Sequence, residues 1–198
     1  MKILAHKSAA NGNESDFVKE TLAMTNAKKT FVEIIKQRLS KADKSEFYPN
    51  VCILFNYIGF KKIQAIREGD VNCRFDAVII DDERSIPIEI KSPREDMEIN
   101  VKAIRQAFEN KIVLLSRKFY PTTNDTTSLS VAFDYPPVRS DVFELIDDIN
   151  KSSGFNIGMI DVGDLANLTY DIVVNKRKVN WKYLNTFRGR LDYESSFV

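Results

Sequence analysis

The chain has 198 residues, of which 43% are hydrophobic and 29% are charged, with only seven glycines and six prolines. This composition is typical of a compact folded domain and excludes collagen-like and intrinsically disordered chains. No apolar stretch approaches the roughly 20 residues of a membrane span, and the N-terminus lacks the apolar core of a signal peptide. We therefore expect a cytoplasmic protein without a membrane partner. The formal net charge of +1 leaves a nucleic-acid partner open, because binding depends on where basic residues cluster.

Histidine and cysteine are too scarce for several kinds of active site. The chain has one histidine, His6, near its N-terminus, and two cysteines, Cys52 and Cys73, without a CxxC spacing. Ser-His-Asp triads, Cys-His pairs and HExxH zinc sites each need a histidine inside the fold. The cysteine spacing argues against a zinc ribbon or a disulfide framework. Catalysis must therefore use carboxylates, lysine, hydroxyl groups or a metal ion held by oxygen ligands.

The first 60 residues have the periodicity of helices, and the next 30 have that of strands. Amphipathic helices are predicted over 15–24, 27–39 and 45–58, the last ending at Gly59. Strands are then predicted over 62–67, 75–80 and 86–91, with turns or loops at 68–70 and 81–84.

The remaining residues alternate between the two periodicities. A helix over 99–110 is followed by an apolar segment, 112–116, that resembles a buried strand. After a polar loop at 121–128, the pattern predicts a strand over 129–135, a helix over 141–150 and a strand over 155–162. This order of elements predicts an α/β sandwich built on a mixed sheet.

The predicted hairpin of 75–91 brings three charged side chains to one face. Alternate residues of a strand share a face, so Glu89 and Lys91 point the same way. The four-residue loop 81–84 sets a register that places Asp76 opposite Glu89. The same register places Ala77 and Ile79 beside Ile88 and Ile86, on the opposite, apolar face. The loop length and the hydrophobic pattern therefore agree.

Two carboxylates and an ammonium group at the end of a hairpin suit the hydrolysis of a phosphodiester. Asp76 and Glu89 offer oxygen ligands for Mg²⁺, for which Mn²⁺ can substitute, and the main-chain carbonyl of Ile90 can add another. Lys91 would orient or deprotonate the attacking water and stabilise the charge of the pentacovalent state. The alternative is that Glu89 and Lys91 are ordinary charges at a strand end that pair with each other.

Asp76, twelve intervening residues and then Glu89-Ile90-Lys91 resemble the PD-(D/E)xK signature of restriction-endonuclease-like nucleases. Phe75 stands where that family often has proline. The order of elements over 45–116 is similar to the common core of the family. The resemblance implies a single nuclease domain, 1–198, with the restriction-endonuclease-like αβα sandwich around a central mixed sheet. Residues 1–44 would be a helical extension, and residues 117–198 an α/β addition with a basic tail.

The same resemblance implies two further site residues. The family often adds an acidic residue from its first core helix, for which Glu46 is the nearest match and Glu33 the reserve. In the helix after the lysine strand, Gln106 stands where related nucleases often place a glutamine near the metal or the scissile phosphate.

The region 175–190 is a basic cluster without acidic residues, and aromatic residues are interleaved with its charges. Its basic members are Lys176, Arg177, Lys178, Lys182, Arg188 and Arg190, and its aromatic members are Trp181, Tyr183 and Phe187. Such residues can neutralise phosphates and stack on bases, which would make this cluster a DNA-binding surface. The alternative is a C-terminal helix that packs its aromatic residues on the core and leaves its charges in water.

Together these features predict a Mg²⁺-dependent endodeoxyribonuclease that acts on double-stranded DNA. A type II restriction endonuclease, or its cleavage subunit or domain, fits the resemblance and the length best. Double-strand cleavage then implies a homodimer, or a heterodimer with a recognition or cleavage subunit. Two alternatives remain, a structure-specific repair or recombination nuclease of the same fold and a non-catalytic DNA-binding module.

Overall fold

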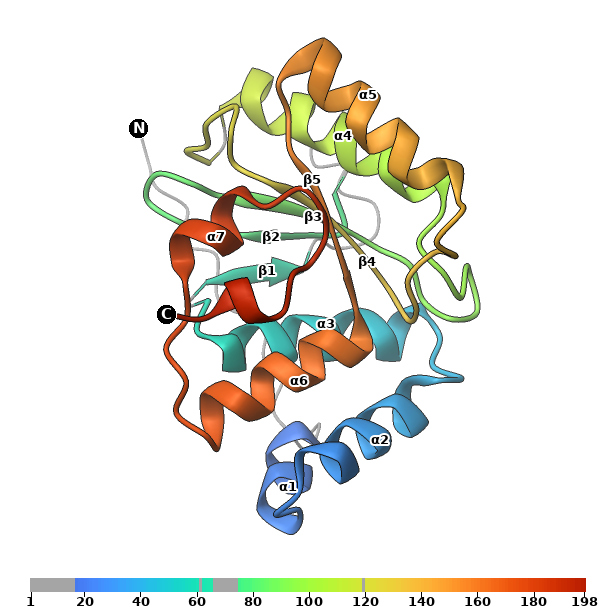
Figure 1. The fold of residues 1–198 in the computed structure, drawn as a ribbon, viewed down its shortest axis with the longest axis vertical. Helices are drawn as coiled ribbons and strands as arrows, with labels where there is room; N and C mark the ends of the chain where they lie inside the picture. Colours follow the sequence, from blue (N-terminus) through green and yellow to red (C-terminus); the bar gives the residue numbers. More distant parts are fainter. Residues whose placement is uncertain (1–16, 61, 66–74, 119) are drawn as a thin grey trace.

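The computed structural model describes residues 17–60, 62–65, 75–118 and 120–198, which form one mixed sheet between two layers of helices (Figure 1). The six strands lie in the sheet in chain order: β1 (Ile63–Ala65), β2 (Ala77–Ile79), β3 (Ile86–Ile90), β4 (Ser128–Ala132), β5 (Ile157–Asp161) and β6 (Gly189–Arg190). Strands β1 to β3 pair antiparallel, whereas β3 to β6 pair parallel. Strand β3 therefore joins the antiparallel and parallel halves of the sheet.

Helices cover both faces of the sheet, as the αβα prediction requires (Figure 1). One face is covered by α3 (Lys44–Ile58) and α6 (Val162–Val173), with α1 (Phe17–Met24) and α2 (Lys28–Leu39) outside them. The other face is covered by α4 (Val101–Arg117) and α5 (Asp141–Ser153). The C-terminal segment adds α7 (Trp181–Thr186) and the short 3-10 helix η1 (Glu194–Ser196). None of the helices in the described part of the chain is long and apolar enough to cross a membrane.

The register of the β2–β3 hairpin is the predicted one. Ala77 pairs with Ile88 and Ile79 pairs with Ile86. These four side chains belong to the large core under α3 and α6. Because side chains alternate along a strand, Glu89 lies on the opposite face, under α4. The pattern of the hairpin thus separates an apolar face from the face that carries the charges.

The helix α3 begins and ends where its capping residues stand. The Asp43 carboxylate accepts hydrogen bonds from the backbone N–H groups of Ser45 and Glu46 in the first turn of the helix. Gly59 ends the helix with a left-handed backbone, φ +113°, and its N–H donates to the carbonyls of Asn56 and Phe55. The predicted end of this helix at Gly59 is confirmed.

The predicted strand over 112–116 is wrong, because α4 continues without a break to Arg117. Leu114 is buried, but Ile112 is 43% exposed, so the segment has only one apolar face. The buried positions Ala103, Ala107 and Leu114 continue the helical spacing of the preceding turns. The strand beside β3 is β4, which begins at Ser128, a residue that the sequence pattern places in the preceding loop.

Other predicted boundaries differ by a few residues, and neither helix α6 nor strand β6 was predicted. Helix α5 extends to Ser153, and α6 begins directly after β5, where the Asp161 side chain accepts a hydrogen bond from the N–H of Asp164. The strand predicted over 62–67 is observed as β1 at Ile63–Ala65. Residues 66 and 67, and the predicted turn at 68–70, lie outside the described residues, as do His6 and Cys73.

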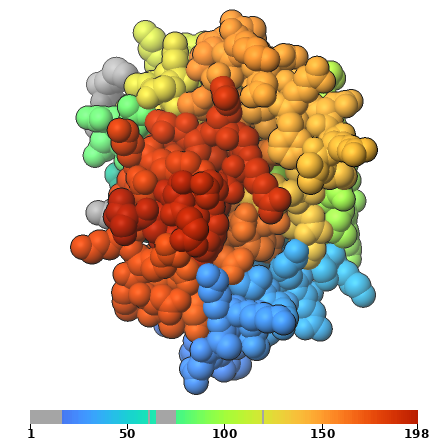
Figure 2. Space-filling model, in the orientation of Figure 1, coloured from blue at the N-terminus to red at the C-terminus, as the bar shows by residue number. Residues whose placement is uncertain are grey.

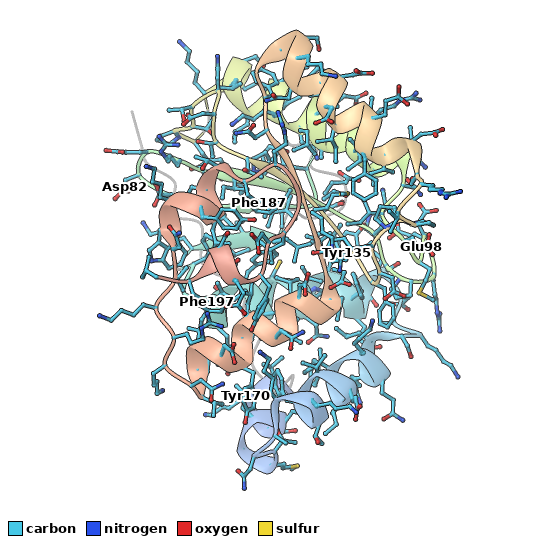
Figure 3. All side chains as sticks on the ribbon, viewed as in Figure 1. Asp82, Glu98, Tyr135, Tyr170, Phe187 and Phe197 are labelled. Carbon is cyan, nitrogen blue, oxygen red and sulfur yellow. The ribbon has the colours of Figure 1, made fainter. Side chains whose placement is uncertain are left out.

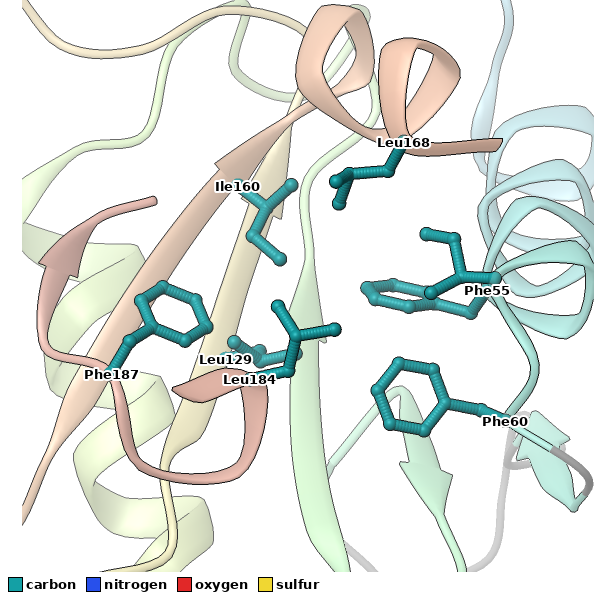
Figure 4. Close-up of a pocket in the computed structure, with 8 residues that line it drawn as sticks. Phe55, Phe60, Leu129, Ile160, Leu168, Leu184 and Phe187 are labelled. Carbon is teal, nitrogen blue, oxygen red and sulfur yellow. The ribbon is translucent and has the colours of Figure 1, made fainter. Parts of the chain in front are cut away.

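A small apolar cavity of about 10 Å³ lies in the core between α3, the sheet and α7 (Figure 4). It is lined only by apolar side chains, those of Phe55, Ile58, Phe60, Leu129, Ile160, Leu168, Leu184 and Phe187. It is too small for a substrate and offers no hydrogen-bonding group, so it is a gap in packing rather than an active site.

We expect Gly158→Ala to destabilise the protein, because β5 needs glycine where Phe187 packs on it. A Cβ atom at position 158 would lie 2.6 Å from the Phe187 ring and 2.8 Å from Thr127 Cγ2. Overpacking of this kind costs about 1–3 kcal/mol, which urea unfolding would measure. The double variant Gly158→Ala/Phe187→Leu should lose less stability than the sum of the losses of the two single variants. Strictly additive losses would contradict this explanation.

Candidate active site

The three residues of the predicted site meet at the open end of the β2–β3 hairpin. Asp76 directly precedes β2, and its backbone N–H donates to the carbonyl of Ile88 over 3.1 Å. Its side chain turns towards β3, where Oδ2 accepts the backbone N–H of Ile90 over 2.9 Å. The Asp76 carboxylate is therefore fixed beside the residue that separates Glu89 from Lys91.

Glu89 and Lys91 form a buried ion pair. Lys91 Nζ lies 2.8 Å from Glu89 Oε1, and Lys91 and Glu89 are only 7% and 3% exposed. The second oxygen, Glu89 Oε2, accepts a hydrogen bond of 2.9 Å from Asn110 Nδ2 of α4. Both the functional interpretation of this pair and the alternative, in which its two members neutralise each other, require such a contact. The Asp76 carboxylate lies beside this pair as well, which a simple ion pair does not require.

The surroundings of the site shift the pKa values of Asp76 and Lys91. Burial raises the pKa of Asp76 to about 6, and the negative charge of Glu89 adds to this effect. The N–H of Ile90 and the ammonium groups of Lys44 and Lys91 act in the opposite direction. Burial lowers the pKa of Lys91, but its hydrogen bond with Glu89 and the charge of that carboxylate leave the pKa above its ordinary value. Lys91 is therefore charged at neutral pH.

The first turns of α3 supply two residues that the sequence did not reveal. Tyr48 donates its hydroxyl to the Ile90 carbonyl, and the same hydroxyl lies 3.1 Å from Glu95 Oε2. Lys44 is half-exposed, with its Nζ 3.9 Å from Asp76 Oδ1 and 4.9 Å from the centre of the Tyr48 ring. Their spacing of four residues places them on one face of a helix, but only the fold shows that this face meets the hairpin.

The loop after β3 also borders the site. Glu95 Oε2 accepts hydrogen bonds of 3.0 Å from both the backbone N–H and the hydroxyl of Ser92. These bonds, with that of Tyr48, hold the pKa of Glu95 below its ordinary value, although burial acts in the opposite direction. A partly exposed, ionised carboxylate thus lies at the edge of the site. No motif in the sequence pointed to this residue.

The two additional residues implied by the family resemblance lie in different surroundings. Glu46 pairs with Arg38 of α2, through an Arg38 Nε to Glu46 Oε1 distance of 3.1 Å. Among the described residues, no three acidic, histidine or cysteine side chains gather as a metal-binding group, so Glu46 does not complete such a group with Asp76 and Glu89. Gln106 lies one turn before Asn110 on α4, and its buried Oε1 finds no hydrogen-bond partner in the part of the chain that the structure describes.

The C-terminal segment, which contains the basic cluster of 175–190, forms part of the face of the molecule shown in Figure 2, where it is drawn in red. Its aromatic residues anchor it to the core, since Trp181 packs edge-on to Phe60 and Phe187 is buried over Gly158. Figure 3 shows the labelled Phe187 and Phe197 on this segment. The structure thus favours the packing interpretation for Phe187, whereas Trp181 packs on Phe60 but stays 41% exposed.

Several of the basic residues are already engaged by the protein. Arg177 contacts Asp171 and Glu194, at 3.3 and 2.9 Å, and Arg188 contacts Asn150 and Asp147. The guanidinium of Arg190 lies 4.0 Å from the centre of the Tyr135 ring, and Lys176 donates to the Val173 carbonyl. Lys178 and Lys182 are exposed and have no ion pair with a described residue. These two are therefore the best placed of the six for a phosphate.

No protein-family model and no curated protein matches the sequence. Solved structures do match the fold, among them two of the restriction endonuclease FokI. The restriction endonuclease FokI superposes with a TM-score of 0.61 at 12% identity, over 93% of this chain and 35% of that one. FokI bound to DNA superposes with a TM-score of 0.56, also at 12% identity, over 88% of this chain and 33% of that one.

These matches establish the class of fold. The chain has the restriction-endonuclease fold of FokI, with its mixed sheet between helices, as the PD-(D/E)xK resemblance predicted. The chain spans about a third of the length of FokI.

We expect Asp76→Asn to stabilise the protein at pH 8 when no divalent metal is added. The folded-state pKa of Asp76, about 6, lies above the ordinary value. The stability associated with this group is therefore present below about pH 4 and is lost as the pH rises through 6. Asparagine cannot ionise, so the variant should melt above the wild type at pH 8, by an amount that shrinks towards pH 4. A variant that melts below the wild type at pH 8 would contradict the assigned charge balance.

Proposed function

We propose that this chain is a Mg²⁺-dependent endodeoxyribonuclease that hydrolyses phosphodiester bonds of double-stranded DNA. The observation that carries the proposal is the contact of the Asp76 carboxylate with the Ile90 N–H. This contact places a second carboxylate beside the buried Glu89–Lys91 pair. The restriction-endonuclease fold supports the same conclusion independently of the site.

The donor atoms at the site fit Mg²⁺. The carboxylates of Asp76 and Glu89 and the carbonyl of Ile90 are hard oxygen ligands, and Mg²⁺ keeps several waters beyond those that the protein supplies. Glu89 already accepts one hydrogen bond on each oxygen, but an ionised carboxylate has about four lone-pair sites and can accept a metal as well. Likewise, the Ile90 carbonyl has a second lone pair beside the one that Tyr48 uses. When bound, the ion would lower the pKa of a coordinated water and neutralise charge on the phosphate.

Three side chains of the site have distinct roles in the remaining chemistry. Lys91 is charged, so it orients the attacking water and stabilises the negative charge of the pentacovalent state rather than acting as the base. Glu89 holds Lys91 in place through their 2.8 Å contact. Lys44, at the exposed edge of the site, is placed to contact a non-bridging phosphate oxygen once its attraction to Asp76 is relieved.

We further propose that the chain is a type II restriction endonuclease or a cleavage subunit or domain of one. Its similarity extends over only about a third of FokI, so a partner or a further domain would supply target recognition. One copy of the site cuts one strand, and double-strand cleavage would need a homodimer or a heterodimer. The exposed Lys178 and Lys182 are the residues of the C-terminal segment that we assign to phosphate contacts.

Lys91→Ala should abolish cleavage of supercoiled plasmid in Mg²⁺, because it removes the group that orients the attacking water. The matched control is Lys29→Ala on α2, whose side chain is 89% exposed and should leave cleavage unchanged. Agarose-gel analysis distinguishes nicked from linear products. Cleavage by Lys91→Ala at the wild-type rate would overturn the proposed site.

The products of the wild type carry further information. Discrete linear fragments would indicate a sequence-specific enzyme complete in this chain. Nicking, or cleavage only with a partner protein, would indicate a cleavage subunit or domain. No cleavage with any divalent metal or partner would overturn the nuclease proposal in favour of a DNA-binding module.

Lys178→Ala/Lys182→Ala should weaken DNA binding and flatten its dependence on salt. Removing one lysine–phosphate pair reduces the slope of log K against log[salt] by about 0.9, so the double variant should show a slope smaller by about 2. Fluorescence anisotropy at several salt concentrations measures both quantities. Lys29→Ala/Lys19→Ala, which removes two lysines of α1 and α2, controls for net charge. Equal slopes in wild type and double variant would place Lys178 and Lys182 outside the DNA interface.

A further inference from the structure

The face of the sheet beneath α4 carries a buried polar cluster around Glu89, and its other two members have no role in the proposed catalysis. It consists of Glu89 on β3, Ser130 on β4 and Asn110 on α4, which are 3%, 0% and 2% exposed. Burial of a polar side chain costs free energy unless the side chain is hydrogen-bonded. We infer that Asn110 is a positioning residue that fixes the Glu89 carboxylate in the orientation that binds the metal ion. This inference rests on the proposed function.

The contact of Asn110 is specific to one oxygen atom. Asn110 Nδ2 donates to Glu89 Oε2 over 2.9 Å, while Lys91 Nζ lies 2.8 Å from Oε1. The two donors come from different parts of the fold, helix α4 and the end of β3, and together they set the rotation of the carboxylate about its last bond. Lys91 alone leaves that rotation free, because a single contact on one oxygen permits the other oxygen to swing.

Ser130 is the competing partner that Asn110 excludes. Glu89 and Ser130 are direct neighbours in the parallel β3–β4 pair, and their side chains share a face. The Ser130 hydroxyl is buried and has no hydrogen-bond partner among the described residues. An unsatisfied buried hydroxyl gains a hydrogen bond if the carboxylate turns towards β4. The hydrogen bond from Asn110 instead keeps the Glu89 carboxylate turned away from β4, where it also contacts Lys91. The Ser130 hydroxyl is therefore left without this acceptor.

This arrangement has a direct consequence for metal binding. Residues that orient a metal ligand through a hydrogen bond typically change metal affinity or activity by 10–100-fold when they are removed. The contact of Asn110 with the site is made by Nδ2, an amide N–H donor that binds Glu89 and is not a metal ligand. Its removal should therefore weaken metal binding by releasing Glu89 towards Ser130.

The test measures Mn²⁺ affinity by isothermal titration calorimetry, independently of cleavage. Asn110→Ala should weaken Mn²⁺ binding by roughly tenfold or more. Ser130→Ala in the Asn110→Ala background should recover part of the loss, because it removes the competing donor. The matched control is Ser128→Ala, which deletes the buried bond from Ser128 Oγ to the Ala107 carbonyl between β4 and α4 and should leave Mn²⁺ affinity unchanged.

Two further measurements cover the case in which Asn110→Ala does not fold. Asn110→Ser keeps a polar group at the position but shortens it, and should lose Mn²⁺ affinity in the same direction. In the wild type, the side-chain amide signals of Asn110 in a ¹⁵N spectrum should shift on addition of Mg²⁺, because the acceptor of that amide gains a cation. An amide that does not respond to Mg²⁺ would overturn the inference without any variant.

The possible results distinguish a failure of the role assigned to Asn110 from a failure of the proposed nuclease function. Wild-type affinity in Asn110→Ala or Asn110→Ser, with metal binding abolished in Asp76→Ala, would overturn the role of Asn110 and leave the nuclease proposal intact. An equal loss in Ser128→Ala would overturn it too, since any damage to the α4–β4 contact would then suffice. A wild-type chain that binds neither Mn²⁺ nor Mg²⁺ would overturn both.

Discussion

The burial of two neighbouring charges at the end of strand β3 is the constraint on which the rest of this structure depends. Glu89 and Lys91 lie in and directly after β3, under α4, where an unpaired charge would be prohibitively costly. Their 2.8 Å contact offsets much of that cost, and Asn110 satisfies the remaining carboxylate oxygen. The sheet beneath them is apolar on its other face, where Ile88 and Ile90 pack in the core under α3 and α6. One strand thus supplies both the core and the reactive groups.

The site forms where two kinds of strand pairing meet. β3 pairs antiparallel with β2 and parallel with β4, so it receives Asp76 from one side and Ser130 from the other. Helix α3 closes the end of the hairpin with Lys44 and Tyr48. Burial, together with the repulsion between Asp76 and Glu89, raises the pKa of Asp76 to about 6. A site whose own charges repel each other is one that a divalent cation would stabilise.

The similarity to FokI shows how little sequence identity this architecture requires. At 12% identity, the chain superposes over 93% of its length on about a third of FokI. The identity is low because most core positions need only an apolar residue of suitable size, and many sequences satisfy that requirement. The charged residues on β3 are a far narrower requirement, because few alternatives can be buried there. Fold similarity and site chemistry are therefore independent grounds for the nuclease proposal.

Patterns in the sequence were sufficient for the features whose physical causes are local. The loop 81–84 and the strand alternation were enough to predict the register of Ala77 and Ile79, and Gly59 was enough to end α3. Tertiary packing determined the other features. The segment 112–116 has the composition of a buried strand, but its first apolar residue faces solvent once α4 lies on the sheet. Asn110, Tyr48 and Lys44 join the site from helices distant in the chain, and Arg177 and Arg188 are held by acidic or amide partners that no linear pattern reveals. A contact between residues far apart in sequence depends on how whole elements pack, which short-range periodicity does not encode.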